Sequence, residues 1–354
     1  MKKPLVGVVM GSDSDWKVMQ PAVQEAAAIL RRGGLVAFPT ETVYGLGADA
    51  ENPEALARIF AAKGRPANHP VIVHIGRAEQ LEHWAADIPP SAWRLAQRFW
   101  PGPLTLILKR HARVPDAVTG GQDTVGLRVP DHPVALALLA AFGGGIAAPS
   151  ANRFGRLSPT TAAHVRAELG DAVDDIVDGG PCRVGIESTI LDLSGARPRL
   201  LRPGAIAAAE LEAVLGEPAL EAPGDAPRVS GMFPSHYAPQ TPLTLVDPDR
   251  LPSEVRRCVE TGERVAVLAR AAATPQVERL FSCGPAFTQC VWQVMPSEPA
   301  GYARELYARL HALDALRVER ILVEAPPPDA PWEAVRDRLA RAAQAGPDPK
   351  AAHA

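Results

Sequence analysis

The chain has 354 residues, more than one compact domain usually holds, so we expect two domains. Its 47% hydrophobic and 22% charged residues are typical of a globular protein with a sizeable core. The formal net charge is −3, which excludes a global basic field for nucleic acid. Any contact with RNA would therefore need a local basic patch.

The four cysteines are widely spaced and form no CxxC pair, which argues against a zinc site and against a disulfide scaffold. This usage fits a reducing cytoplasm. Two lysines follow the first residue, but the apolar run after them is too short for a signal peptide, and no apolar stretch approaches the length of a membrane span. We expect a cytoplasmic protein that makes no membrane contact.

Helical periodicity and helix caps predict the helices of the first domain. These helices are expected at residues 22–33, 52–64, 89–102, 158–170 and 205–216. Strands are expected at residues 35–39, 69–75, 104–110, 124–130, 145–152, 175–180, 188–194 and 198–204. Asn52 and Ser158 are expected to cap the second and fourth helices.

A Pro- and Gly-rich stretch with little periodicity, residues 216–242, predicts a linker. Strands and helices then alternate through residue 345, which predicts a smaller α/β domain with a parallel sheet. Its strands are expected at residues 243–247, 264–269, 289–295 and 320–326, and its helices at 253–262, 301–316 and 332–344. Residues 346–354 are expected to form a frayed tail.

Residues 39–50, PTETVYGLGADA, contain a Gly-x-Gly-x-x-Ala pattern that imitates a dinucleotide fingerprint. No ribose-binding acid follows at the end of a second strand, so we reject that interpretation. A tight turn is the simplest alternative. The other is that Thr40, Thr42 and Tyr44 line the floor of a pocket.

Lys63 and Arg65 stand two residues apart at the end of a predicted helix. A solvated basic end that complements the helix dipole is the ordinary interpretation of such a pair. Pro66 and the strand that follows fix this segment, however. Two fixed cations near His69 and His74 suit a polyanion such as a triphosphate.

Residues 143–160 combine a Gly-rich strand entry, a Ser-Ala-Asn loop and the start of a predicted helix. The hydroxyls of Ser150 and Ser158, with backbone N–H groups at the helix start, would make a phosphate cradle. Simple capping is the alternative.

Thr124 and Arg128 lie on the same face of a predicted strand, because side chains alternate along a strand. On that face Arg128 would bind a carboxylate or form a surface ion pair.

Other chemical signals are weak or missing. Glu187 and Ser188 begin a predicted strand, and Arg202 lies at the end of another; each is a weak signal alone. The chain has no Walker A motif, no HExxH and no defensible Ser-His-Asp order. Nucleotide chemistry would therefore rest on positioning by cations and hydroxyls, which suffices for attack on phosphorus.

Six motifs, in the order PTETVYGL, KGRP, PSAN, ESTI, LRPG and SHYAPQTP, resemble those of the YrdC-type threonylcarbamoyl-AMP synthases in their long, two-domain form. The resemblance covers about residues 22–345. It implies an α/β protein with a YrdC-like catalytic domain at 21–215, built on a twisted open mixed sheet with helices. A linker at 216–242 and a Rossmann-like α/β domain at 243–345 would follow.

The resemblance also implies an activity. Such enzymes make L-threonylcarbamoyl-AMP and diphosphate from threonine, bicarbonate or CO2, and ATP carrying Mg2+, with no protein metal site. A downstream transferase complex then modifies adenosine 37 of tRNA. The residues implied to meet threonine are Thr42, His74, Arg128, Ser188 and the backbone of Ala148. Those implied to meet ATP are Lys63 and Arg65, both also catalytic, with His69, Thr124, Ser150, Asn152, Ser158, Arg202 and Tyr237.

Two parts of the chain depart from the pattern of the threonylcarbamoyl-AMP synthases. The family often has Asp-Asn-Pro where this chain has Asn68-His69-Pro70, so the ATP contact at His69 is left open. The first stretch, VGVVMGSDSDW, resembles the first strand and phosphate loop of the PurE-type carboxyaminoimidazole ribonucleotide mutases, and that resemblance ends near Gln20. The rest of that fold is missing, so we interpret residues 1–20 as an appended fragment.

Three other functions are alternatives to the synthase activity. A non-catalytic RNA- or tRNA-binding module of the same fold is the main alternative, although the acidic balance counts against it. A carbamoyl-transfer enzyme of the hydrogenase-maturation type would bring zinc-finger-like and acylphosphatase segments, and the sequence has neither. A purine mutase lacks the downstream part of its fold.

Overall fold

The computed structural model describes residues 16–218, 220–221, 226–232, 236–273 and 290–344. The chain divides into two compact units. The first contains residues up to 154 together with 158–232, and the second contains residues 155–157 together with 233 onward.

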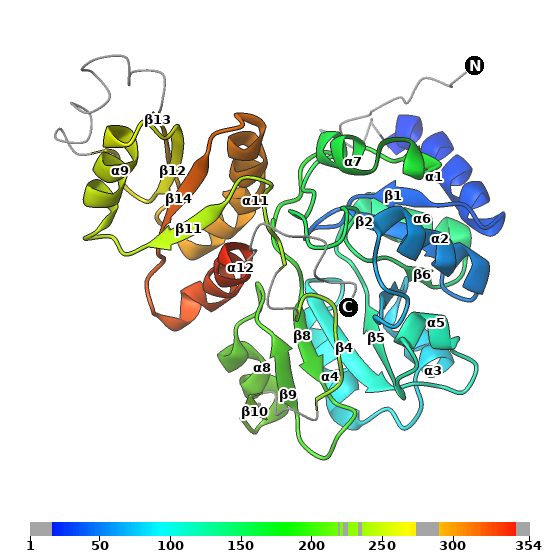
Figure 1. Cartoon of the computed structure of the whole chain (residues 1–354). Helices are drawn as coiled ribbons and strands as arrows, with labels where there is room; N and C mark the ends of the chain where they lie inside the picture. The colour runs from blue at the N-terminus through cyan, green and yellow to red at the C-terminus, as the bar shows by residue number, and fades with distance from the viewer. Residues whose placement is uncertain (1–15, 219, 222–225, 233–235, 274–289, 345–354) are drawn as a thin grey trace. The chain divides into compact units, whose positions relative to one another are not determined.

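The first unit is built on a mixed sheet (Figure 1). Its strands are β1 (Val36–Phe38), β2 (Gly45–Asp49), β3 (Ile72–His74), β4 (Leu104–Lys109), β5 (Thr124–Arg128), β6 (Ile146–Ala147), β7 (Asp175–Ile176), β8 (Thr189–Asp192), β9 (Arg199–Arg202) and β10 (Leu220–Glu221). Among the described residues their order is β10-β9-β8-β4-β5-β3-β6-β2-β1-β7. The glycines of the rejected dinucleotide fingerprint lie in strand β2 rather than in a phosphate loop.

Helices cover both faces of this sheet. They are α1 (Trp16–Arg31), α2 (Pro53–Lys63), α3 (Leu81–Trp84), α4 (Pro90–Phe99), α5 (Asp116–Thr119), α6 (Pro133–Phe142), α7 (Ala162–Leu169) and α8 (Ala208–Leu215), with 3-10 turns at Ala78–Gln80 and Gly170–Ala172. Helices α1 and α6 pack with Val36 and Phe38 in one core cluster. Leu35 and Ala37 point the other way, into the larger cluster with α2, α4 and α8, as alternation along a strand requires.

The helix at 52–64 is confirmed with its predicted caps: Asn52 accepts from two backbone N–H groups of the first turn, and Gly64 ends α2 in the left-handed conformation. Two other helix starts were predicted wrongly. Helix α1 begins at Trp16 and contains Pro21, with Met19 buried in the core. Helix α7 is capped by Thr161, not by Ser158.

The second unit contains the predicted parallel sheet, in the order β11-β14-β12-β13 (Figure 1). Its strands are β11 (Leu243–Val246), β12 (Val265–Ala269), β13 (Cys290–Val294) and β14 (Arg320–Glu324). Its helices are α9 (Leu251–Glu260), α11 (Pro299–Ala315) and α12 (Glu333–Ala343), with a 3-10 turn at Ala330–Trp332. The predicted fold class, a mixed sheet followed by a smaller α/β domain, is confirmed.

Among the helices in the described ranges, none combines the length and the apolar character that crossing a bilayer requires.

Candidate active site

Several predicted site residues lie on neighbouring strands of the first unit's sheet. Strand β3 pairs with β5 so that His74 lies opposite Arg128. Strand β8 pairs with β9 so that Ile190 lies opposite Arg202. The pairing of these strands therefore brings His74 next to Arg128, and it places Arg202 on a strand beside β8.

Arg128 is the centre of the first polar group. Its Nη1 donates to Oγ1 of Thr42 over 2.9 Å, and its Nε donates to the carbonyl oxygen of Gly102 over 3.3 Å. Its Nη2 lies 2.7 Å from Oε1 of Glu41. Only 4% of Arg128 is exposed, so the alternative of a surface ion pair is excluded.

His74 lies beside this group and is 3% exposed. Its ring packs edge-on against Phe38, with 6.1 Å between ring centroids. Burial, and then the charge of Arg128, lowers the pKa of His74 to about 3. The imidazole is therefore neutral near pH 7, and it offers hydrogen-bonding groups without adding charge.

Ser188 joins the neighbouring strands. Its hydroxyl lies 2.8 Å from Oγ1 of Thr105 and accepts from Nη2 of Arg202 over 3.2 Å. Arg202 also donates through Nε to the Ser188 carbonyl oxygen and through Nη1 to that of Ser230, at 3.1 and 2.8 Å. All of these side chains but Ser230 are buried.

Lys63 is the clearest departure from an ordinary helix end. It is 4% exposed, and its Nζ donates to the carbonyl oxygens of Ser150 and Asn152. Burial, and then the charge of Arg65, hold the pKa of Lys63 well below its usual value. The solvated-end interpretation is excluded, because the Lys63 ammonium is buried and donates to carbonyl oxygens of a distant loop.

Arg65 is 9% exposed and also turns inward. Its Nη2 donates to the carbonyl oxygen of Pro70 over 2.7 Å and to Oγ of Ser230 over 3.1 Å. Val229, the residue before Ser230, packs with Ile107 on the sheet. The linker segment around Ser230 therefore belongs to the surroundings of these cations.

Ser158 does not cap a helix. Its hydroxyl donates to Oε1 of Glu187 over 2.5 Å, and both side chains are buried. The carbonyl oxygens of Pro159 and Thr160 accept from the backbone N–H groups of Tyr44 and Cys182, which hold this stretch extended. The expected cradle at a helix start is therefore wrong, although Ser158 remains a polar side chain of the candidate site.

The remaining first-unit predictions occupy varied positions. His69 is partly exposed, its ring lies 5.6 Å from that of Phe154, and burial and then the charge of Arg65 lower its pKa to about 4. Thr124 is partly exposed at the start of β5. Asn152 is buried and donates through Nδ2 to the Arg153 carbonyl oxygen. Ala148 is buried beside α1 and α6.

Two tyrosines predicted to line a binding site, Tyr44 and Tyr237, have side-chain contacts outside the polar groups described above. Tyr44, proposed for a pocket floor, belongs to the large core cluster and donates to the Gly180 carbonyl oxygen over 2.8 Å. Tyr237 is 1% exposed in the second unit, where its ring meets those of His236 and Tyr307 and the guanidinium of Arg338. Its role over a nucleotide stays a prediction.

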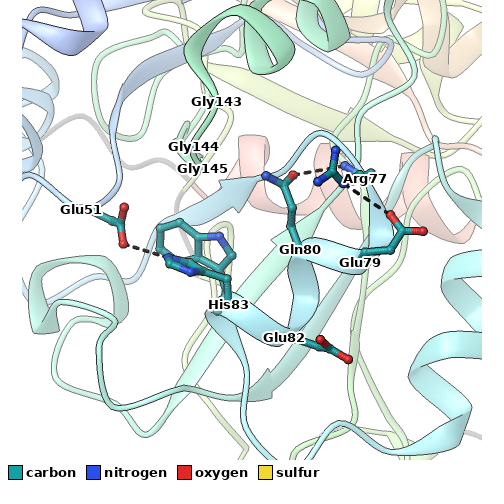
Figure 2. Close-up of a pocket in the computed structure, with 10 residues that line it drawn as sticks. Glu51, Arg77, Glu79, Gln80, Glu82, His83, Gly143, Gly144 and Gly145 are labelled. Carbon is teal, nitrogen blue, oxygen red and sulfur yellow. Dashed lines mark hydrogen bonds and ion pairs between the residues drawn. The ribbon is translucent and has the colours of Figure 1, made fainter.

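A pocket of about 430 Å³ lies elsewhere in the first unit and contains none of the predicted site residues (Figure 2). It is lined by Glu51, Arg77, Glu79, Gln80, Glu82, His83, Trp84, Gly143, Gly144 and Gly145. Two contacts join its lining residues: His83 lies 2.9 Å from Glu51, and Arg77 lies 3.8 Å from Glu79. Both charge signs are present, so the pocket defines no ligand class.

The sequence matches two family profiles that together cover almost the whole chain. Residues 28–204 match the family described as Telomere recombination, and residues 206–344 match the one described as Threonylcarbamoyl-AMP synthase, C-terminal domain. The chain belongs to the two-domain threonylcarbamoyl-AMP synthase family.

Members of this family resemble the chain over nearly its full length. The threonylcarbamoyl-AMP synthase of Bacillus subtilis is 42% identical, with 91% of this chain and 93% of that protein aligned. The Pyrococcus abyssi synthase is 41% identical over 93% of this chain and 94% of that protein. The crystal structure of P. abyssi Sua5 complexed with L-threonine has a TM-score of 0.85, with 37% identity and coverage of 96% and 98%.

Sequence reasoning did not identify Glu41, Thr105 or Ser230 as part of the site. Glu41 lies inside the PTET motif beside Thr42, so its place in that motif was an available signal. Thr105 and Ser230 carry no local signal, because strand pairing and the path of the linker bring them to the site.

Proposed function

We propose that the polar face centred on Arg128 and Lys63 is where this enzyme binds its two organic substrates, threonine near Arg128 and ATP near Lys63. Family membership makes the chain a threonylcarbamoyl-AMP synthase that serves threonylcarbamoyladenosine formation in tRNA. The observation that carries the assignment is the burial of two separate cationic groups in the first unit, Arg128 at the end of strand β5 and Lys63 with Arg65 at the end of helix α2.

Threonine is proposed to bind through its carboxylate to Arg128. Thr42 already accepts a bond from that guanidinium, and Ser188 offers a second buried hydroxyl. The neutral imidazole of His74 would bind the substrate's polar groups, and the backbone of Ala148 would lie alongside. The P. abyssi relative, whose crystal structure contains L-threonine, supports this choice of amino acid.

ATP is proposed to bind through its phosphates to Lys63, Arg65 and Arg202. The hydroxyls of Ser150, Ser158 and Thr124, the amide of Asn152, and His69 would complete its contacts. Lys63 has its pKa held low by burial and by Arg65, so a bound polyanion would favour its charged form.

The chemistry follows from these positions. Bicarbonate takes up a proton and loses water to form CO2. The threonine amine adds to CO2 and releases a proton, so a carbamate results. A carbamate oxygen then attacks the α-phosphorus, forming an O–P bond while the bond to the pyrophosphate oxygen breaks. Lys63 and Arg65 would stabilise the charge that develops on the phosphates.

Mg2+ is proposed to arrive with ATP. Within the described ranges, no three His, Cys, Asp or Glu side chains gather to hold a metal ion. Mg2+ is commonly held by substrate phosphates and waters with few protein ligands, so the residues present fit this mode. The ion would neutralise phosphate charge. The product would pass to a downstream tRNA threonylcarbamoyl transferase complex.

The test is to identify the product. The purified chain is incubated with ATP, Mg2+, threonine and carbon-14 bicarbonate, and nucleotides are separated by chromatography. We expect label in a nucleotide that contains one threonine and one AMP, and none when threonine is omitted. A folded protein that turns over ATP without threonine, or that incorporates no label, would overturn the assignment.

A further inference from the structure

Glu41 is buried at the candidate threonine site, and nothing in the chemistry above uses it. Its side chain is 1% exposed. One carboxylate oxygen, Oε1, lies 2.7 Å from Nη2 of Arg128, and the other, Oε2, accepts from the backbone N–H of Asp131 over 3.0 Å. A hydrogen bond therefore holds Oε2, while Oε1 faces the charge of the guanidinium without a hydrogen bond.

The Arg128 guanidinium faces protein groups at all three of its nitrogens. Nε donates to Gly102, Nη1 donates to Thr42, and Nη2 lies 2.7 Å from Glu41 without forming a hydrogen bond. A guanidinium carries five N–H groups, with two on each terminal nitrogen. Among the described residues, these contacts leave one N–H group of Nη1 and both N–H groups of Nη2 to hydrogen-bond a substrate carboxylate.

The titratable side chains His74, His132 and Cys182 near the pair are uncharged around neutral pH. Burial lowers the pKa of His74 to about 3 and also lowers the pKa of His132, so both rings are neutral near pH 7. Burial raises the pKa of the Cys182 thiol, which stays protonated. Among the described residues, Glu41 is the carboxylate placed against Arg128.

We infer that Glu41 is a positioning residue for threonine, because its carboxylate aims Arg128 at the substrate and so sets the affinity for the amino acid. This inference rests on the proposed function. A buried ion pair is weak evidence for a role in stability alone, since apolar replacements are often neutral. A bidentate carboxylate contact, by contrast, depends on the direction of the guanidinium plane.

The first test is Glu41→Gln, which keeps the side-chain shape and removes the charge. We expect the KM for threonine to rise by roughly tenfold or more, while kcat and the KM for ATP change by less than about threefold, because the lost interaction concerns one substrate. Threonine-induced thermal stabilisation should weaken in parallel. Glu51→Gln is the matched control, since Glu51 is exposed and pairs with His83.

Two further variants keep the test decisive. Glu41→Asp restores a carboxylate and should give a threonine KM between those of the wild type and Glu41→Gln; it also carries the test if Glu41→Gln does not fold. In an Arg128→Gln background, Glu41→Gln should have no further effect on threonine binding, because its action passes through Arg128.

The outcomes separate the inference from the proposed function. If the wild type shows no threonine-dependent turnover, the proposed function fails. If the wild type is active and a folded Glu41 variant keeps its threonine KM, or raises both KM values equally, Glu41 is not a positioning residue for threonine. Additive effects in the Arg128→Gln background would contradict it too.

Discussion

The hydroxyl of Ser158 donates a hydrogen bond to Oε1 of Glu187 over 2.5 Å, inside the first unit. Three residues later, Thr161 accepts from the backbone N–H of His164 and caps α7. One short segment therefore separates two tasks. Ser158 donates to a buried carboxylate and is proposed to contact the nucleotide, and Thr161 starts the helix.

Paired alanine variants distinguish these tasks. Thr161→Ala should lower the free energy of unfolding by about 1 kcal/mol, the usual cost of a lost N-cap, with the KM for ATP unchanged. Ser158→Ala should raise the KM for ATP, because it removes a proposed phosphate contact. Denaturant unfolding and steady-state kinetics check both. A loss of stability in Ser158→Ala together with an unchanged KM for ATP would indicate instead that Ser158 acts as a helix cap.

Lys63→Met should abolish most of the turnover without unfolding the protein. The ammonium is the proposed phosphate ligand, and losing such a group costs roughly 100-fold or more in rate. Replacing a desolvated charge with a side chain of similar size need not lower stability. Lys109→Met, at an exposed lysine, is the control. A Lys63 variant that turns over within a few-fold of wild type would refute the assignment.

His74 should make stability depend on pH. Its folded pKa is about 3, below the ordinary 6.5, so between these values the unfolded chain binds a proton that the native state does not. Stability is therefore fully present above pH 6.5 and falls toward pH 3, by about 1.4 kcal/mol per pH unit for this group. Unfolding titrations of His74→Asn should show a shallower slope than those of wild type. A wild-type slope in His74→Asn would contradict the prediction.

Met19 ties the start of α1 to the core. It is 1% exposed among residues of α1 and α6, so Met19→Ala should cost about 2–5 kcal/mol of unfolding free energy. The neighbouring exposed Gln20→Ala should cost little. Both variants should keep wild-type KM values when folded. Residues 1–20 were interpreted as an appended fragment, but Met19 packs in the core, so such a fragment would have to end before Trp16. Wild-type stability of Met19→Ala would restore the original boundary.

Local signals predicted much of the fold. Asn52 and Gly64 bound α2 through chemistry within a few residues, and the strand–helix alternation after residue 242 was enough to predict a parallel sheet. The failures have tertiary causes. The first helix was predicted to start at residue 22, but core packing of Met19 supports the preceding turn, and α1 begins at Trp16. Ser158 and Pro159 imitate a helix start, but pairing with Tyr44 holds that stretch extended.

The candidate site was predictable as a set of residues but not as an arrangement. The motifs named Arg128 and Lys63, and the structure places both in buried polar groups. Glu41, the carboxylate that faces Arg128, lies far from it in the sequence, and only the folded sheet brings the two side chains together. Nor could local pattern show that Lys63 is held by the carbonyl oxygens of a distant loop.

The most direct test of the central claim is pyrophosphate release from ATP by the purified full chain, measured with and without threonine and bicarbonate in the presence of Mg2+. We expect pyrophosphate release that requires both threonine and bicarbonate and that is lost in Lys63→Met. Release that continues without threonine, or no release from a protein shown to be folded, would contradict it.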